Sequence, residues 1–222
     1  MIEITFYIRK AVLKIADIKE LMIPEIKVIR YKRFMDHRGY FTEQFRKSDL
    51  IDNEEIGFLL RENFVQANES FSYKNTFRGL HFQWNPYMGK LIRPLHGHLI
   101  DFALDIRKGS SNFGKIIAYD LPHNQIDDYA EWIWVPPGFA HGILLIEDSL
   151  IEYFCTGEYS LNCEACISPL SKDIDWSICA RDLKDRFDSI VPKTEFITEK
   201  DKNGLTLADW LVNKNSDNFI YK

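Results

Sequence analysis

The stretch that decides the fold reads Arg78-Gly79-Leu80-His81-Phe82-Gln83-Trp84-Asn85-Pro86-Tyr87-Met88-Gly89-Lys90. Asn85-Pro86 is typical of a turn, and the residues on both sides of it continue as apolar runs, which indicates two strands joined by a tight connection. Because side chains alternate along a strand, Leu80 and Phe82 would face one side and His81 and Gln83 the other. In a small closed barrel the second side would be a pocket. The alternative is a core histidine that makes only a structural hydrogen bond.

The rest of the chain repeats this pattern of short apolar runs between turns. Strand-like runs occupy residues 26–45 (broken by a turn at 36–39), 64–70, 91–107, 115–121, 132–135, 143–146 and 151–154. Helix-like patterns cover residues 46–63, 178–188 and 205–214, and residues 122–130 form a polar loop. At the N-terminus we expect a strand from Ile2 to Ile8 and a short helix around Ala11 to Leu21. Many short strands with few helices predict an antiparallel sandwich or barrel.

Length and composition indicate one soluble globular domain spanning residues 1–222. The chain has 222 residues, 45% of them apolar and 27% charged. A net charge of −5 gives no reason to expect nucleic acid or an anionic membrane as a partner. No apolar run approaches the roughly 18 residues of a membrane span, and charged residues interrupt the N-terminal apolar run, so we expect a cytoplasmic protein without a signal peptide.

The four cysteines give only a weak metal signal. Cys163 and Cys166 have the spacing of a zinc-binding pair, but no second pair and no neighbouring histidine accompany them. We therefore expect reduced thiols, as is usual in the cytoplasm.

The segment Pro136-x-Gly138-x-x-His141 resembles the second motif of cupin barrels. In metal-binding cupins the first motif supplies His-x-His and, later, a glutamate seven residues before a glycine. The matching positions here are His81-x-Gln83 and Lys90, with Gly97 as the glycine. A lysine repels a cation but offers a fixed positive charge to a substrate oxygen. The resemblance implies an all-β cupin barrel (a double-stranded β-helix, or jelly roll) with short peripheral helices, no metal and no cofactor.

Longer strings together resemble the dTDP-4-dehydrorhamnose 3,5-epimerase family. They are Asp36-x-Arg38-Gly39-x-Phe41-x-Glu43, Arg78-Gly79-Leu80-His81-Phe82-Gln83, Gly89-Lys90-Leu91, Asp105-Ile106-Arg107-Lys108 and Pro137-Gly138-Phe139-Ala140-His141-Gly142. The resemblance runs from about Ile26 to Trp176, with a further match near Asp201. It implies a barrel over residues 24–176, preceded by an N-terminal extension (1–23) and followed by a C-terminal helical segment (177–222).

The family resemblance also implies a reaction, a nucleotide-linked 4-keto-6-deoxy sugar as substrate, and a place in deoxysugar or cell-surface polysaccharide (lipopolysaccharide or capsule) biosynthesis. The carbonyl acidifies the protons at C3 and C5, so epimerisation needs a base, a stabiliser of the enolate oxygen and an acid on the opposite face. By resemblance, His81 is the base and Asp201 orients it, Lys90 stabilises the enolate, and Tyr153 is the acid. The residues implied in substrate binding are Arg38, Glu43, Gln66, Asn68, Arg78 and His141, although His141 fits a supporting role better because the metal ligands around it are replaced.

Several departures from the family pattern leave the substrate open. This chain has Gln66-Ala67-Asn68 where the family usually has Gln-x-Asp-Asn, Phe154 in place of a lysine, and Glu158-Tyr159 in place of two tyrosines. We expect these positions near the substrate, so the nucleotide, the sugar (hexose or heptose) and the inversion of C3, C5 or both stay undecided. The alternatives are a keto-isomerase on the same scaffold, a metal-dependent oxygenase and a non-catalytic sugar-binding cupin. The family finally implies a homodimer paired through N-terminal strands, since an unpaired edge strand is costly.

Overall fold

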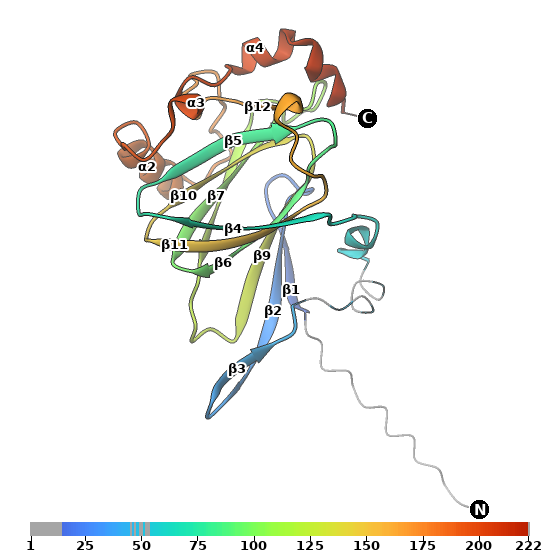
Figure 1. Ribbon diagram of the computed structural model, residues 1–222, viewed down its shortest axis with the longest axis vertical. Coiled ribbons are helices and arrows are strands. Elements are labelled where there is room, and N and C mark those ends of the chain that lie inside the picture. Colours follow the sequence, from blue (N-terminus) through green and yellow to red (C-terminus); the bar gives the residue numbers. More distant parts are fainter. Residues whose placement is uncertain (1–14, 45, 47, 49–50, 52–53, 222) are drawn as a thin grey trace, which may run out of the picture.

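Two antiparallel sheets face each other in the computed structural model, which describes residues 15–44, 46, 48, 51 and 54–221 (Figure 1). In spatial order, the larger sheet contains β1 (Ile15–Glu20), β2 (Lys27–Asp36), β9 (Tyr129–Val135), β6 (Lys90–His96), β11 (Ser149–Cys155) and β4 (Gln66–Ser72), and β3 (Gly39–Thr42) pairs with β2. The smaller sheet contains β12 (Glu164–Cys166), β5 (Phe77–Gln83), β10 (Phe139–Leu145), β7 (His98–Asp105) and β8 (Ile116–Pro122). The expected all-β barrel with short peripheral helices is confirmed.

Alternation along the strands separates the interior of the barrel from its surroundings. Apolar side chains such as Val28, Ile92, Ile133 and Ile151 fill much of the space between the sheets. On β5, Leu80 and Phe82 point to the other side of the smaller sheet, where they join a second apolar core. The expectation from the opening stretch is therefore confirmed for β5, and His81 faces the barrel interior.

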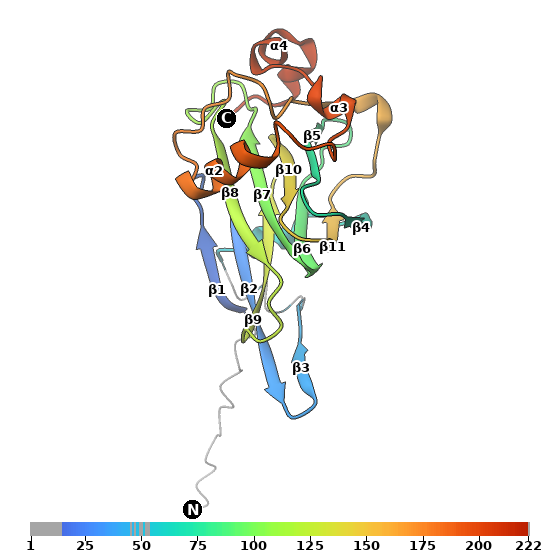
Figure 2. The same ribbon diagram turned by 90° about the vertical axis from the view of Figure 1, so that its left-hand side faces the viewer.

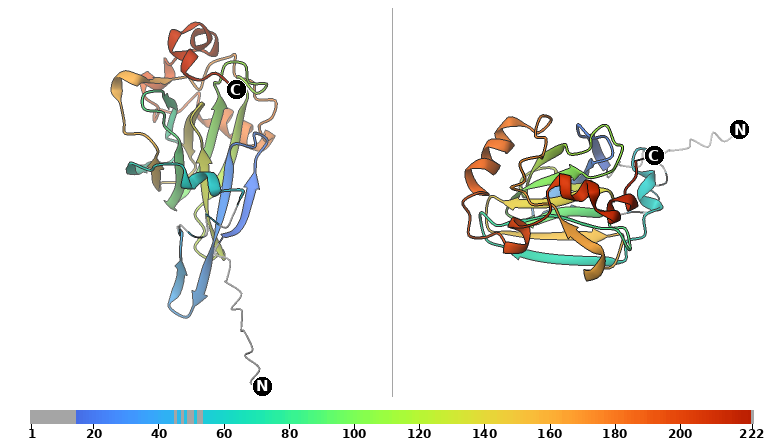
Figure 3. Two further views of the ribbon diagram at one scale, coloured as in Figure 1. Left: turned by 90° about the vertical axis from the view of Figure 1, so that its right-hand side faces the viewer. Right: turned by 90° about the horizontal axis from the view of Figure 1, so that it is seen from above.

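The C-terminal helices cover the outer side of the smaller sheet (Figures 2 and 3). They are α2 (Arg181–Ile190), α3 (Glu199–Lys202) and α4 (Leu207–Val212), with the 3-10 helix η3 (Lys214–Asn218), whereas the 3-10 helix η2 (Leu161–Cys163) directly precedes β12. Phe187 of α2 makes edge contacts with Phe77 and Phe102, and Trp210 of α4 packs on Phe82. Burial of these aromatic side chains fixes the C-terminal segment on the barrel.

A third apolar cluster lies on the outer face of the larger sheet. Tyr31, Trp132 and Trp134 pack there against Ile56 and Leu59, which flank or belong to the 3-10 helix η1 (Gly57–Leu60). Of the helix-like stretch 46–63 the structure describes residues 46, 48, 51 and 54–63, and η1 lies within the last of these ranges. None of the helices in the described ranges is long and apolar enough to cross a bilayer.

The helix expected around Ala11 to Leu21 is wrong for its described part, which forms strand β1. Ile15 and Ile18 are three residues apart, which is also the spacing of apolar residues on one face of a helix. A register shift between Ile15 and Asp17 in the pairing with β2 lets both isoleucines pack on the outer cluster. An irregularity of this kind in a strand imitates the spacing of a helix. The strand expected from Ile2 to Ile8 lies outside the described residues.

The β2–β3 hairpin projects beyond the body of the barrel (Figures 1 and 2). Its turn includes Arg38 and Gly39, and Gly39 has a φ of +128°, a conformation that favours glycine. The polar loop expected at 122–130 is shorter in the structure, because β8 ends at Pro122 and β9 begins at Tyr129.

Candidate active site

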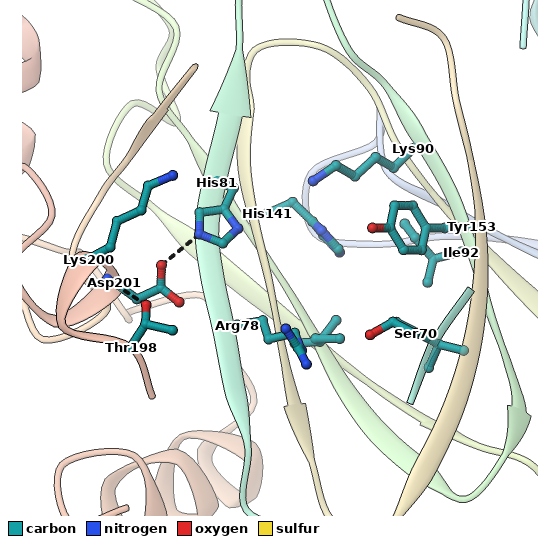
Figure 4. Close-up of a pocket in the computed structure, with 12 residues that line it drawn as sticks. Ser70, Arg78, His81, Lys90, Ile92, His141, Tyr153, Thr198, Lys200 and Asp201 are labelled. Atoms are coloured by element: carbon teal, nitrogen blue, oxygen red, sulfur yellow. Dashed lines mark hydrogen bonds and ion pairs between the residues drawn. The ribbon is translucent and has the colours of Figure 1, made fainter. Parts of the chain in front are cut away.

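A cavity of about 340 Å³ opens between the two sheets. Figure 4 shows His81 on one wall and Tyr153 on the opposite wall, with the Lys90 ammonium group reaching into the space between them. His81 comes from β5 of the smaller sheet, whereas Lys90 and Tyr153 come from β6 and β11 of the larger sheet. The closed barrel therefore brings together residues that are up to about 70 positions apart in the sequence.

Close contact between two strands positions His81. Gly79 has a φ of +127°, and a Cβ added there would lie 2.5 Å from the Cα atom of Gly142 in β10. Only glycine fits such a contact, which explains the Arg78-Gly79 pair in the opening stretch. His81 is paired across the strands with His141 of β10 and with Cys166 of β12.

The expected contact between Asp201 and His81 is present, with 2.7 Å between Asp201 Oδ1 and His81 Nε2. Thr198 caps helix α3, and its hydroxyl accepts a hydrogen bond from the backbone N–H of Asp201. Burial acts to raise the pKa of Asp201, but the hydrogen bonds that the carboxylate accepts, first from His81 and also from the backbone N–H of Gly79, outweigh it, so the pKa is lowered. An ionised carboxylate only accepts, so Nε2 of His81 carries the proton in a neutral ring. The second ring nitrogen then offers a lone pair on the cavity side (Figure 4).

Tyr153 and Lys90 supply the opposite wall. Tyr153 is paired with Ile92 of β6 and Asn68 of β4, and Cys155 is paired with Lys90, so alternate residues of these strands point inward. Burial raises the pKa of the Tyr153 phenol, which keeps it protonated and able to donate. Burial lowers the pKa of Lys90, although the charge of Asp101 is among those that act in the opposite direction.

A second cavity of about 430 Å³ adjoins the first, because Ser70, His81, Lys90 and Tyr153 line both. Gln66 and Asn68 lie in this second space, as the sequence implied, and a 3.0 Å hydrogen bond joins their side-chain amides. Gln66 Oε1 also accepts from the backbone N–H of Tyr159. Together the two spaces provide room for a reacting group beside His81 and for a longer attached group.

Two cations at the first cavity suit an anionic ligand. Arg78 lines the cavity, donates from Nε to Ser72 at 2.9 Å, and forms no ion pair with a carboxylate in the described part of the chain. Lys200, which sequence reasoning missed, lines the same cavity and lies 2.6 Å from Glu164 Oε1. Its position next to Asp201 was a usable signal. Ser70 was also missed, although it follows Asn68 by two residues on one strand and so shares its face.

His141 lines the cavity but is held by a buried carboxylate. Its Nε2 lies 2.8 Å from Oδ2 of Asp101, which has no solvent exposure. Burial lowers the pKa of His141, so the ring is neutral near pH 7 despite the neighbouring Asp101 charge. This arrangement is compatible with the supporting role considered from the sequence.

Three positions lie away from the cavities in a single chain. Arg38 is 78% exposed at the tip of the projecting hairpin and pairs with Asp36, and Glu43 pairs with Arg46 beyond β3. Phe154, expected near the substrate, points to the outer face of the larger sheet and stacks on Trp132 with 5.6 Å between ring centroids. That expectation is corrected: alternation turns Phe154 outward where Tyr153 points inward.

The residues at the cupin metal position do not fit a metal ion. Gln83 Nε2 donates to the backbone carbonyls of Pro86 and Glu158, and its Oε1 accepts from the backbone N–H of Ser160. Both ends of its amide are therefore already hydrogen-bonded to backbone groups. Lys90 presents an ammonium group instead of a carboxylate.

Another set of possible donors, His81, Cys166 and Asp201, lies within 4.8 Å. Burial and the charge of Asp201 raise the pKa of Cys166 to about 12, so the metal-free residue is a protonated thiol, and a bound metal ion would have to displace its proton.

Comparison with known proteins identifies the same family that the sequence motifs resemble. The family model described as dTDP-4-dehydrorhamnose 3,5-epimerase matches residues 20–209. The chain belongs to this family. Its members are isomerases, and the chain is an enzyme of that class.

Individual members of the epimerase family are similar over most of the chain. The dTDP-4-dehydrorhamnose 3,5-epimerase of Shigella flexneri is 34% identical over 191 residues, which are 84% of this chain and 93% of that protein. The Escherichia coli enzyme of the same name is 37% identical over 158 residues, covering 69% and 81% of the two chains. The Legionella pneumophila epimerase RmlC, solved in complex with dTDP-4-keto-L-rhamnose, superposes with a TM-score of 0.74 at 29% identity. That superposition covers 93% of this chain and 98% of the Legionella chain.

Proposed function

We propose that the enzyme inverts both C3 and C5 of a dTDP-linked 4-keto-6-deoxy sugar without a cofactor. The observation that carries the proposal is the opposed placement of His81, held by Asp201, and Tyr153 across one cavity, with Lys90 between them (Figure 4). A binding protein has no need for a base and an acid on opposite walls. The relatives' names, which specify the 3,5-epimerase reaction, further support it.

The chemistry follows from these three groups. The free ring nitrogen of His81 removes the proton next to the carbonyl, and Asp201 stabilises the imidazolium that forms. The Lys90 ammonium group stabilises the enolate oxygen, where negative charge develops. Tyr153 then donates its phenolic proton to the other face of the same carbon, which inverts the centre. The same set acts on C5 and on C3, because both carbons lie beside the C4 carbonyl.

The remaining cavity residues bind the substrate in this proposal. Arg78 and Lys200 are cations at the cavity and bind the diphosphate, since guanidinium groups donate two parallel hydrogen bonds to phosphate oxygens. Gln66 and Asn68 in the adjoining space bind the nucleoside or sugar through their amides. His141, held by its hydrogen bond to Asp101, supports the wall of the first cavity.

Arg38 and Glu43 require a second subunit in this proposal. The hairpin that carries Arg38 projects away from the barrel, so its guanidinium group is exposed and distant from the cavity of its own chain. In a homodimer that exchanges N-terminal strands, the hairpin of one subunit reaches the cavity of the other. We place this dimer in the cytoplasm, in deoxysugar synthesis for surface polysaccharide. Light scattering at micromolar concentration tests the dimer, and the mass of a monomer would contradict it.

Incubation with dTDP-4-keto-6-deoxyglucose in deuterated water, followed by NMR, tests the reaction. We expect deuterium at C3 and C5 and a product inverted at both centres. Parallel incubations with other nucleotides and with heptose analogues identify the substrate. Exchange and inversion at one carbon alone would replace the proposal by a mono-epimerase. Movement of the keto group would replace it by a keto-isomerase.

A further inference from the structure

A separate cavity of about 280 Å³ lies at the base of the β2–β3 hairpin. It is lined by Arg33 of β2, Tyr40 of β3, Arg93 of β6 and His123 of the loop between β8 and β9, among others. Ile92 lines the active-site cavity, whereas its neighbour Arg93 lines this one, so the two cavities lie on opposite faces of the larger sheet. The volume is close to the lower end of the range for small-molecule sites, roughly 300–1,000 Å³.

Arg33 is the unusual residue of this cavity. It is 4% exposed, and its Nε is buried without a hydrogen-bond partner. Its Nη1 donates only to the backbone carbonyls of Asn124 and Asp127, and its guanidinium lies over the Tyr40 ring at 4.4 Å from the centroid. No described carboxylate lies within ion-pair distance of Arg33.

A comparison with Arg107 shows what is missing at Arg33. The Arg107 side chain is 13% exposed, and two carboxylates, those of Asp105 and Glu25, neutralise it. A buried cation without a counter-ion and with an unsatisfied donor is costly. Carboxylates neutralise Arg107, whereas no described carboxylate neutralises Arg33.

None of the other charged groups that line the cavity forms an ion pair with Arg33. Arg93 pairs with Glu152. Glu131 is already bound by Arg30 and by the Tyr119 hydroxyl.

The loop between β8 and β9 adds one anion and one imidazole to the cavity. Asp127 accepts from the Asn124 amide. Burial lowers the pKa of His123, and the positive charges of Arg33, Arg93 and His96 act in the same direction.

We propose that this cavity is a second binding site, for a small oxyanion such as phosphate or the phosphate group of a metabolite. The guanidinium group of Arg33 lines the cavity and donates to the anion, and Arg93, which is paired with Glu152, lies on the same cavity wall. Arginine suits this ligand because its planar donors match the oxygens of phosphate. The site is independent of the active site, since no residue lines both cavities.

Phosphate calorimetry at constant ionic strength tests the site. The active-site cavity also carries cations, so the parent protein is the Arg78→Gln variant, which weakens phosphate binding there. We expect the parent to bind phosphate at one site per chain, and Arg78→Gln/Arg33→Gln to bind at least about tenfold more weakly. The matched control is Arg78→Gln/Arg186→Gln, which changes an exposed arginine on α2 and keeps the affinity of the parent. Equal affinity with and without Arg33, or no binding by the parent, overturns the proposal.

Two further measurements keep the test decisive if Arg33→Gln does not fold. Arg33→Lys retains the charge but loses the fork, and we expect it to fold and to bind phosphate more weakly than the parent. Crystals of the wild-type protein grown with phosphate should contain the anion at hydrogen-bond distance from Arg33 Nε. A carboxylate of a second copy of the chain at that position instead would overturn the proposal. Titration with glucose 1-phosphate identifies the source: tighter binding than that of inorganic phosphate indicates a sugar phosphate, and equal binding indicates the free ion.

Discussion

The histidines of two histidine–aspartate pairs lie opposite each other on β5 and β10, and the two pairs differ mainly in what surrounds them. The pair His81–Asp201 has a 2.7 Å contact and a histidine side chain that is 33% exposed. The pair His141–Asp101 has a 2.8 Å contact, and its histidine side chain is only 9% exposed. In both pairs the carboxylate side chain is almost completely buried.

The carboxylates also differ in their other partners. Asp201 has further donors, including the backbone N–H of Gly79, whereas Oδ1 of Asp101 is buried without a partner. In the proposed function the same chemical pair provides a base at His81, where the ring is open to the cavity, and a support at His141, where both partners are enclosed. Exposure of the ring, rather than the hydrogen bond to a carboxylate, distinguishes the two roles.

The largest expected effect comes from His81. His81→Ala should lower deuterium exchange at both C3 and C5 by about 10³–10⁴-fold, because no enolate forms without the base. NMR in deuterated water measures both positions. The matched control is His98→Ala, since His98 forms a similar contact with Asp120 at 2.6 Å but does not line the cavity. Normal exchange by His81→Ala would refute the assignment of the base.

Lys90 should have the next largest effect. Lys90→Met should reduce exchange and epimerisation together by about 10²–10³-fold, because both steps pass through the enolate that the ammonium group stabilises.

The pH profile sharpens the assignment of Lys90. Burial disfavours the ammonium form and lowers the pKa of Lys90, so its charge is lost at a lower pH than that of an ordinary lysine. The rate of deuterium exchange should therefore fall as the pH rises above neutrality. Lys90→Arg should move this fall to higher pH, because arginine stays charged. An unchanged alkaline limb in Lys90→Arg would assign the titration to another group.

A smaller effect separates the two carboxylates. Asp201→Asn should reduce exchange by about 10²-fold with little loss of stability, because an amide does not stabilise the imidazolium. Asp101→Asn should instead lower the free energy of unfolding by about 1–3 kcal/mol, because it introduces a buried amide donor without a partner. Denaturant unfolding and exchange, measured on both variants, compare the two effects. If Asp101→Asn reduced exchange and Asp201→Asn reduced stability instead, His141 would be the base and His81 the support.

The barrel could be predicted from the sequence because strand periodicity is local. The runs around the opening stretch became β5 (Phe77–Gln83) and β6 (Lys90–His96) nearly as expected. β1 was misread because its strand irregularity has a helical spacing.

The site was less accessible from periodicity alone. Asp201 is 120 residues from His81, and only the family resemblance suggested their contact. Lys200 was missed although it adjoins Asp201, because the charged segment also contains Lys202 and periodicity does not show which lysine faces the cavity. Arg33 was not distinguished, since the sequence does not show which arginines lack a carboxylate after folding.

The central claim is that base and acid lie on opposite sides of the sugar, and Tyr153→Phe tests it most directly. Without the phenolic proton, His81 can still return a deuteron to the face from which it took the proton. Deuterium exchange with retention should therefore persist, while formation of the inverted product falls by about 10²–10⁴-fold. NMR of one reaction in deuterated water measures both quantities. A ratio of exchange to epimerisation equal to that of the wild-type enzyme would contradict the account.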